Sequence, residues 1–156
     1  MEEIKKAYNE ALKILSYKNY TSQEIYKKLI NKGFKEDVVE QAVRELKQKK
    51  YLNDEEYAKL WLENHQLLKP VGKRKVYWDL AKKGIPKEII EKLVSDISEE
   101  YEYQTALKLA NTRIKRYHND SMEKKLNKTA AFLKRRGFGY DVIIKILQEL
   151  KNQLRT

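Results

Sequence analysis

The side chains that most often carry catalysis or bind metals are few and scattered in this sequence. It contains no cysteine, so thiolate nucleophiles and cysteine zinc sites are excluded. The two histidines, His65 and His118, are far apart in the chain, and neither belongs to a cluster with metal-ligand spacing. The string Gly137-Phe138-Gly139 lacks the strand–loop–helix context of a phosphate-binding loop. We therefore expect no enzyme activity, no catalytic residue, no metal and no cofactor.

Positive charge is the chemistry that the sequence does offer, and it is unevenly distributed. The formal net charge is +11. Residues 1–50 carry 12 basic and 8 acidic side chains, residues 51–102 carry 9 and 11, and residues 103–156 carry 13 and 4. The excess in the last third predicts a surface that faces a polyanion, either nucleic acid or an acidic protein. The alternative is that lysine-rich helices only keep the protein soluble.

The basic residues gather in the segments that precede Gly84 and Gly137. A cation near a helix C-terminus is favoured by the helix dipole, so part of this pattern is structural. The dipole does not explain three adjacent cations at Lys134-Arg135-Arg136, or a basic helix start at Lys73-Arg74-Lys75. The candidate residues for contact with nucleic acid or a protein filament are Lys73, Arg74, Lys75, Lys82, Lys83, Arg113, Lys115, Arg116, Lys124, Lys125, Lys128, Lys134, Arg135 and Arg136.

These residues belong to a repeat that is found by comparing the sequence with itself. Gly33, Gly84 and Gly137 each follow a basic residue, have a leucine four positions before them and an apolar residue directly after them. Apolar doublets and further apolar residues then recur at matching offsets in all three copies. The glycine is expected to end one helix in the left-handed conformation, and the downstream residues have the spacing of an amphipathic helix.

Each copy contains two further helices before its glycine. Thr21-Ser22-Gln23-Glu24 reads as a capping box, Ser121 is the expected cap in copy three, and Pro86 fits the first turn of the helix that follows Gly84. Long helices are expected at about residues 2–17, 54–68 and 98–117.

The predicted fold is therefore all-α. It consists of three tandem three-helix, helix-turn-helix-like repeats at residues 1–50, 51–102 and 103–156, in an elongated, curved array. Because the helix after each glycine turn is acidic or mixed, sequence-specific reading of a DNA groove is not expected. Trp61, Trp78 and most of the eleven tyrosines are expected at core and junction positions.

The order and spacing of these motifs resemble the RecX family of regulatory proteins, which act on the RecA recombinase. The resemblance rests on segments such as Leu29-Ile30-Asn31-Lys32-Gly33-Phe34, Tyr51-Leu52-Asn53-Asp54 and Leu133-Lys134-Arg135-Arg136-Gly137-Phe138. His65 departs from it, because the family commonly has arginine there.

The resemblance implies a non-enzymatic regulator that binds the groove of the RecA–DNA filament. Such a regulator modulates RecA ATP turnover, strand exchange and filament growth in DNA repair and the SOS response. The expected partners are the RecA filament and DNA bound without sequence preference, and no membrane. The expected protein is a cytoplasmic monomer. Two alternatives remain, a non-specific DNA-binding architectural protein and an adaptor for an acidic partner protein.

Overall fold

The computed structural model describes residues 1–155, and in this range the chain is entirely helical. It forms nine α-helices, one short 3-10 helix and no strand, which confirms the predicted all-α fold. Thr156, the last residue of the predicted third repeat, lies outside the described residues. Within the described range, every helix is too short or too polar to cross a bilayer.

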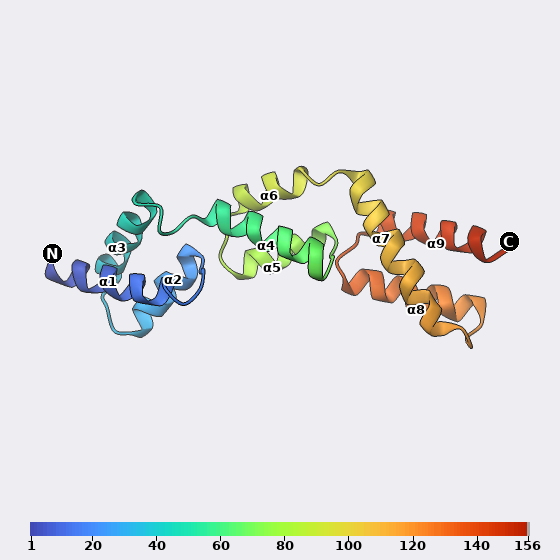
Figure 1. Cartoon of the computed structure of the whole chain (residues 1–156), viewed down its shortest axis with the longest axis horizontal. Coiled ribbons are helices and arrows are strands. Elements are labelled where there is room, and N and C mark those ends of the chain that lie inside the picture. The colour runs from blue at the N-terminus through green and yellow to red at the C-terminus, as the bar shows by residue number, and fades with distance from the viewer. Residues whose placement is uncertain (156) are drawn as a thin grey trace. The chain divides into compact units, whose positions relative to one another are not determined.

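The helices follow the order predicted from the repeat (Figure 1). They are α1 (Glu2–Leu15), α2 (Ser22–Asn31), α3 (Glu36–Gln48), α4 (Asp54–Leu68), α5 (Lys73–Lys82), α6 (Lys87–Ser95), α7 (Glu99–Ile114), η1 (Lys115–Tyr117), α8 (Met122–Arg135) and α9 (Tyr140–Arg155). The three predicted long helices correspond to α1, to α4, and to α7 with η1.

Local capping sets several of these helix starts. The Thr21 hydroxyl accepts from the Glu24 amide while the Glu24 carboxylate accepts from the Thr21 amide, which is the predicted capping box. Ser121 caps α8 by accepting from the Lys124 amide. Pro86 directly precedes α6 instead of lying in its first turn, and its carbonyl accepts the first hydrogen bonds of that helix.

Each repeat glycine lies just beyond the end of a helix and has positive φ. The values are +100° at Gly33, +84° at Gly84 and +89° at Gly137. In each copy the residue after the glycine donates its amide to the leucine carbonyl four positions before the glycine, as Phe34 does to Leu29. This hydrogen bond closes the turn and directs the chain into the next helix.

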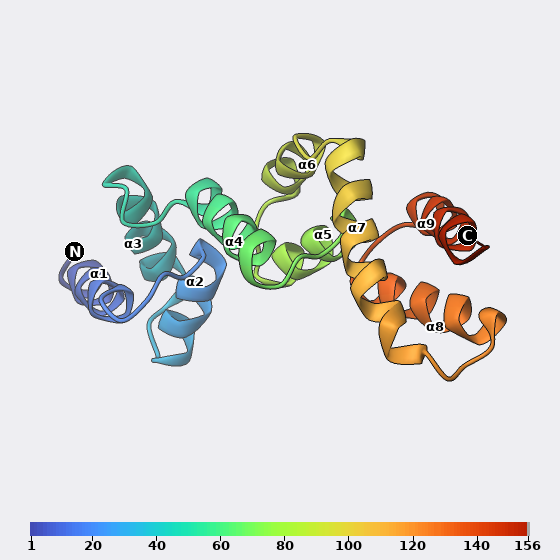
Figure 2. The same ribbon diagram turned by 45° about the vertical axis from the view of Figure 1, so that its right-hand side comes forward.

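The chain divides into two compact units. The first comprises Met1–Trp61 and Asp79–Ile90, and the second comprises Leu62–Trp78 and the residues from Glu91 onward. In the first unit α1, α2 and α3 pack against one another (Figures 1 and 2) around a core of small and aliphatic side chains. This core consists of Ala7, Ala11, Ile25, Leu29, Val39, Ala42, Val43, Leu46 and Leu52.

In the second unit α7, α8 and α9 pack in the same way, with α7 passing across the other two helices (Figure 1). Alanines on α7 allow close approach of α8 and α9, whose larger side chains fill the core. The core consists of Ala106, Ala110, Leu126, Phe132, Leu133, Phe138, Ile143, Ile146 and Leu150.

Within the first unit, the glycine turn after α5 is joined to the start of α2. The Thr21 hydroxyl donates to the Lys83 carbonyl at 2.6 Å, and Thr21 is completely buried. The Ser22 amide donates to the Asp54 carboxylate at 2.8 Å. Gly84 lies directly against Gln23, so a Cβ at Gly84 would overlap the Gln23 side chain.

Within the second unit, the glycine turn after α8 is joined to the start of α5 by equivalent contacts. The Gly72 amide donates to the Arg136 carbonyl at 2.7 Å, and the Lys73 amide donates to the Glu102 carboxylate at 2.8 Å. Gly137 lies directly against Lys75. The two junctions are therefore similar. In each, a carbonyl of the glycine turn accepts a hydrogen bond from a helix start, from a hydroxyl in the first and an amide in the second, and a carboxylate accepts a helix-start amide.

The tyrosines and tryptophans lie around the cores or on the surface and not in the core interiors. None of the eleven tyrosines and neither tryptophan is fully buried, and Trp78 is 62% exposed. Tyr8, Tyr20, Tyr26 and Tyr103 are partly buried and pack against the two cores, as expected for many of the tyrosines, while the core interiors contain none. The cores are small and are filled by aliphatic side chains and phenylalanine, whereas a tyrosine hydroxyl needs water or a polar partner.

Candidate functional site

Twelve of the fourteen candidate contact residues lie in the second compact unit. Lys82 and Lys83, at the end of α5, belong to the first unit. The twelve are Lys73, Arg74, Lys75, Arg113, Lys115, Arg116, Lys124, Lys125, Lys128, Lys134, Arg135 and Arg136. They come from the start of α5, the end of α7 with η1, and the two ends of α8.

Five of these cations are exposed and form no ion pair with any described residue. They are Lys115, Arg116, Lys124, Lys134 and Arg135. An exposed cation without a carboxylate partner keeps its charge available for an external anion. We call these five residues the open cations of the third repeat.

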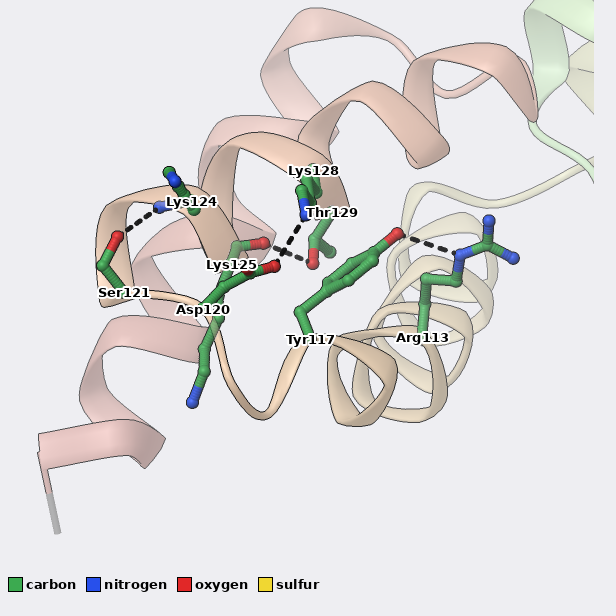
Figure 3. Close-up of polar contacts among 8 residues, drawn as sticks. All are labelled: Arg113, Tyr117, Asp120, Ser121, Lys124, Lys125, Lys128 and Thr129. Carbon is green, nitrogen blue, oxygen red and sulfur yellow. Dashed lines mark hydrogen bonds and ion pairs between the residues drawn. The ribbon is translucent and has the colours of Figure 1, made fainter.

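The turn between α7 and α8 is held together by polar contacts (Figure 3). Lys128 forms an ion pair with Asp120 at 2.7 Å, and its ammonium group lies 5.3 Å from the centre of the Tyr117 ring. The Tyr117 hydroxyl accepts from Nε of Arg113 at 3.1 Å. Lys128 is therefore partly neutralised by Asp120, and Arg113 is fixed in orientation.

Asp120 lies in a strongly basic neighbourhood. Its hydrogen bond with Lys128 lowers the pKa of the Asp120 carboxyl below its usual value, and the charges of Lys128, Lys124 and Lys125 lower it further against the opposing effect of burial. At the start of α8, the Thr129 hydroxyl donates to the Lys125 carbonyl at 2.8 Å (Figure 3). Asp120 is thus a negative charge inside a positive surface.

Arg136 differs from its neighbours Lys134 and Arg135 because its side chain is held by the protein. Its guanidinium group donates to the Pro70 carbonyl at 2.7 Å and lies 5.1 Å from the centre of the Phe132 ring. Burial and the nearby charge of Arg113, in that order, lower the pKa of Arg136 from its usual value. Arg136 therefore has a structural role in addition to the contact predicted for it.

Arg113 lies on the same aromatic ring as Arg136, with its guanidinium carbon 4.4 Å from the centre of the Phe132 ring. Neither arginine forms an ion pair with a residue of the described range. The two like charges held against one ring have no carboxylate between them, which favours binding of an external anion.

The basic start of α5 has a compensating acidic partner. A helix N-terminus disfavours cations, and the Glu102 carboxylate offsets this effect by accepting the Lys73 amide. The Arg74 amide donates to the Gly137 carbonyl at 3.1 Å, while the Arg74 side chain is exposed. Arg74 is therefore the cation of this group that is best placed to reach a partner.

Sequence reasoning missed the residues that position the cations. Tyr117, Asp120, Phe132 and Pro70 were not singled out, although all four contact arginines or lysines of the candidate set. Arg113 and Tyr117 are four residues apart, as are Phe132 and Arg136. This spacing places both pairs on common helix faces and was the available signal.

In the described part of the chain, no group of three or more histidine, cysteine or acidic residues is arranged to hold a metal ion. What the site offers is positive charge at fixed positions, which suits binding of phosphate or carboxylate groups.

Comparison with known proteins gives three consecutive matches to family models of one protein. The first, second and third three-helix domains of RecX match residues 7–46, 53–93 and 99–147. The chain belongs to the RecX family. The third match starts where α7 begins, ahead of the boundary predicted at residue 103. The bounds 1–50, 51–102 and 103–156 stay a proposal.

Curated relatives and solved structures agree with this membership. The regulatory protein RecX of Clostridium perfringens (strain SM101 / Type A) is 33% identical over 97% of this chain and 71% of its own length. The regulatory protein RecX of Chlorobium limicola is 34% identical over 90% of this chain and 86% of its own length. The crystal structure of RecX from Lactobacillus salivarius matches with a TM-score of 0.86 and 31% identity, covering 96% of this chain and 97% of that one.

Proposed function

We propose that this RecX-family chain is a non-enzymatic regulator that binds the RecA–DNA filament and inhibits RecA. On this proposal it lowers RecA ATP turnover, strand exchange and filament growth, and so acts in DNA repair and the SOS response. It works as a monomer in the cytoplasm. Relatives across the whole chain carry the name regulatory protein, which supports a regulatory role over a catalytic one.

The observation that carries the proposal is the set of open cations in the third repeat, within a chain that matches all three RecX domains. A filament of RecA on DNA presents DNA phosphates and acidic protein side chains. Lys134 and Arg135 at the end of α8, with Lys115 and Arg116 in η1, offer four cations that no described carboxylate neutralises. Arg74 at the start of α5 extends the same chemistry to the second repeat.

Binding to DNA alone is the alternative function, and it predicts a different dependence on RecA. Non-specific phosphate contact by the same cations would make the chain an architectural DNA-binding protein. In that case RecA on the DNA would leave its affinity unchanged or lower it, because RecA covers the phosphates. An adaptor for an acidic protein would bind neither RecA nor DNA.

The test is a titration of the chain against single-stranded DNA, with and without RecA and a non-hydrolysed nucleotide. Fluorescence anisotropy of a labelled chain gives both affinities. The proposal predicts clearly tighter binding to the RecA-coated DNA than to bare DNA. Equal or weaker binding to the RecA-coated DNA would support the architectural alternative, and no binding to either would support the adaptor.

A further inference from the structure

The first repeat carries a surface that the RecA proposal does not use. Two lysine ammonium groups, those of Lys18 and Lys28, each lie 4.9 Å from the centre of the Tyr20 ring. The ammonium group of Lys49 lies 5.1 Å from the centre of the Tyr8 ring, and this ring packs edge-on against Tyr51 at 6.4 Å. All of these contacts lie in the first compact unit.

A shallow hollow of about 130 Å³ borders these contacts through Tyr20 and Tyr51, while Lys18, Lys28 and Lys49 lie outside its lining. Tyr20, Tyr51, Tyr57 and Lys50 all line it, and Glu56 is the one carboxylate among its lining residues. We call Tyr20 and Tyr51 with Lys18, Lys28, Lys49 and Lys50 the tyrosine–lysine surface. Lys18 and Tyr20 lie in the α1–α2 connection, Lys28 lies on α2, and Lys49, Lys50 and Tyr51 lie in the turn after α3.

The charges of this surface are not neutralised inside the protein. None of its four lysines forms an ion pair with a described residue. By contrast, Lys32 in the same repeat forms an ion pair with Glu10 at 2.9 Å. The Tyr20 ring contacts both Lys18 and Lys28 without cancelling their charge.

The surface also exposes an aromatic ring beside these cations. Tyr51 is 55% exposed, although it follows the closed turn at the end of α3. An exposed tyrosine next to several unpaired lysines matches the two needs of a flexible, single nucleic-acid strand. The strand places a base on the ring face and its phosphates on the lysines. Bases of a duplex are stacked on one another and cannot use the ring in this way.

We propose that the tyrosine–lysine surface binds single-stranded nucleic acid, with a base stacked on Tyr51 and phosphates on Lys18, Lys28, Lys49 and Lys50. This site is separate from the open cations of the third repeat, and it can bind nucleic acid in the absence of RecA. It deepens the proposed function only in that a RecA filament contains single-stranded DNA. Its test therefore leaves RecA out.

The stacking contact is tested by two substitutions at Tyr51 in the full chain. The probe is a fluorescein-labelled oligothymidylate, and the readout is anisotropy. Tyr51→Ala should weaken binding roughly tenfold, the effect of losing one stacked base, whereas Tyr51→Phe keeps the ring and should bind like the unchanged chain. Circular dichroism checks that both variants fold. Equal affinity of a folded Tyr51→Ala variant would overturn the stacking contact.

The phosphate contacts are tested by a charge-matched pair of triple variants. Lys18, Lys28 and Lys49 are changed to Gln in one variant, and Lys5, Lys13 and Lys47 in the other. The second set has the same charge and lies in the same repeat, but contacts no aromatic ring. The first variant should lose more affinity for the oligothymidylate than the second. The slope of log K against log salt should become shallower by roughly 0.7 for each lost phosphate contact.

Two outcomes would overturn the proposal. One is an equal loss of affinity in both triple variants, which would mean that only net charge matters. The other is oligothymidylate binding that is unchanged in both the folded Tyr51→Ala variant and the Lys18/Lys28/Lys49 variant, which would mean that this surface does not contact nucleic acid. Failure of the RecA proposal itself would appear as an absence of RecA inhibition, whatever the oligothymidylate results are.

Discussion

Asp120 is the residue whose removal should most increase the available positive charge of the third repeat. It neutralises Lys128 and lies near Lys124 and Lys125. Asp120→Asn should strengthen binding to the RecA–DNA filament roughly two- to fivefold, the size of a surface charge interaction. Glu123→Gln, in the first turn of α8, makes the same change in net charge without breaking an ion pair. If both variants bind equally well, the Asp120–Lys128 pair has no special effect.

The same ion pair gives the stability of the protein a defined pH dependence. The folded pKa of Asp120 is lower than its unfolded value of about 3.9, chiefly because of Lys128. The pair therefore contributes fully above the unfolded pKa, and its contribution is lost as the pH falls through the folded pKa. Urea unfolding of the unchanged chain and of Asp120→Asn should differ at neutral pH and converge in acid. A difference that grows toward acid pH would contradict the assignment.

The backbone conformation of Lys50 destabilises the fold, and a single substitution can remove this cost in free energy. It has φ of +66°, the one positive value among the described residues other than glycine, in the turn that follows α3. Lys50→Gly should raise the free energy of unfolding by about 1 kcal/mol, because glycine has no Cβ to clash in this conformation. Lys49→Gly is the control, since Lys49 has φ of −87° and gains nothing. Chemical denaturation that shows no gain for Lys50→Gly would contradict the conformation.

At the scale of the elements, the three glycine turns are alike in backbone conformation but differ in their surroundings. A Cβ at Gly33 meets no atom, one at Gly84 overlaps the Gln23 side chain, and one at Gly137 overlaps both side chain and backbone of Lys75. Gly33→Ala should cost roughly 1 kcal/mol for the left-handed conformation alone. Overpacking should add about 1–3 kcal/mol at the other two positions, most at Gly137, where backbone must move. Urea unfolding measures all three, and equal costs would mean that the junctions contribute little.

The difference between the surroundings of these glycines also shows which structural features could be predicted from the sequence alone. Capping at Thr21 and positive φ at the repeat glycines depend on neighbours in the chain, so the sequence predicted them. The hydrogen bond from Thr21 to Lys83 joins residues 62 positions apart, and no local sequence pattern predicts it. Likewise, Arg135 and Arg136 are the same residue type, and only the fold shows that Arg136 is held by Pro70 and Phe132. Which tyrosines pack against a core, as Tyr26 and Tyr103 do, and which are exposed, as Tyr140 is, also depends on the fold.

At the scale of the whole molecule, three diverged copies of one unit have different charges on a common framework. The hydrogen bonds at the starts of α2 and α5 match, so the backbone is alike at the two junctions. The third copy nevertheless carries most of the positive charge. The elongated, curved array expected from the repeat stays a prediction, which small-angle X-ray scattering of the full chain can test. A compact particle in solution would contradict it.

The central claim is that this RecX-family chain inhibits RecA through the open cations of its third repeat. The most direct measurement is the ATPase rate of RecA on single-stranded DNA as the chain is titrated in. We predict that the unchanged chain lowers the rate, and that changing both Lys134 and Arg135 to Ala weakens this inhibition at least several-fold. A variant with Lys5 and Lys13 changed to Ala, which loses the same charge from the first repeat, should inhibit normally. An ATPase rate unaffected by the unchanged chain would contradict the function, and full inhibition by the Lys134→Ala/Arg135→Ala variant would contradict the site.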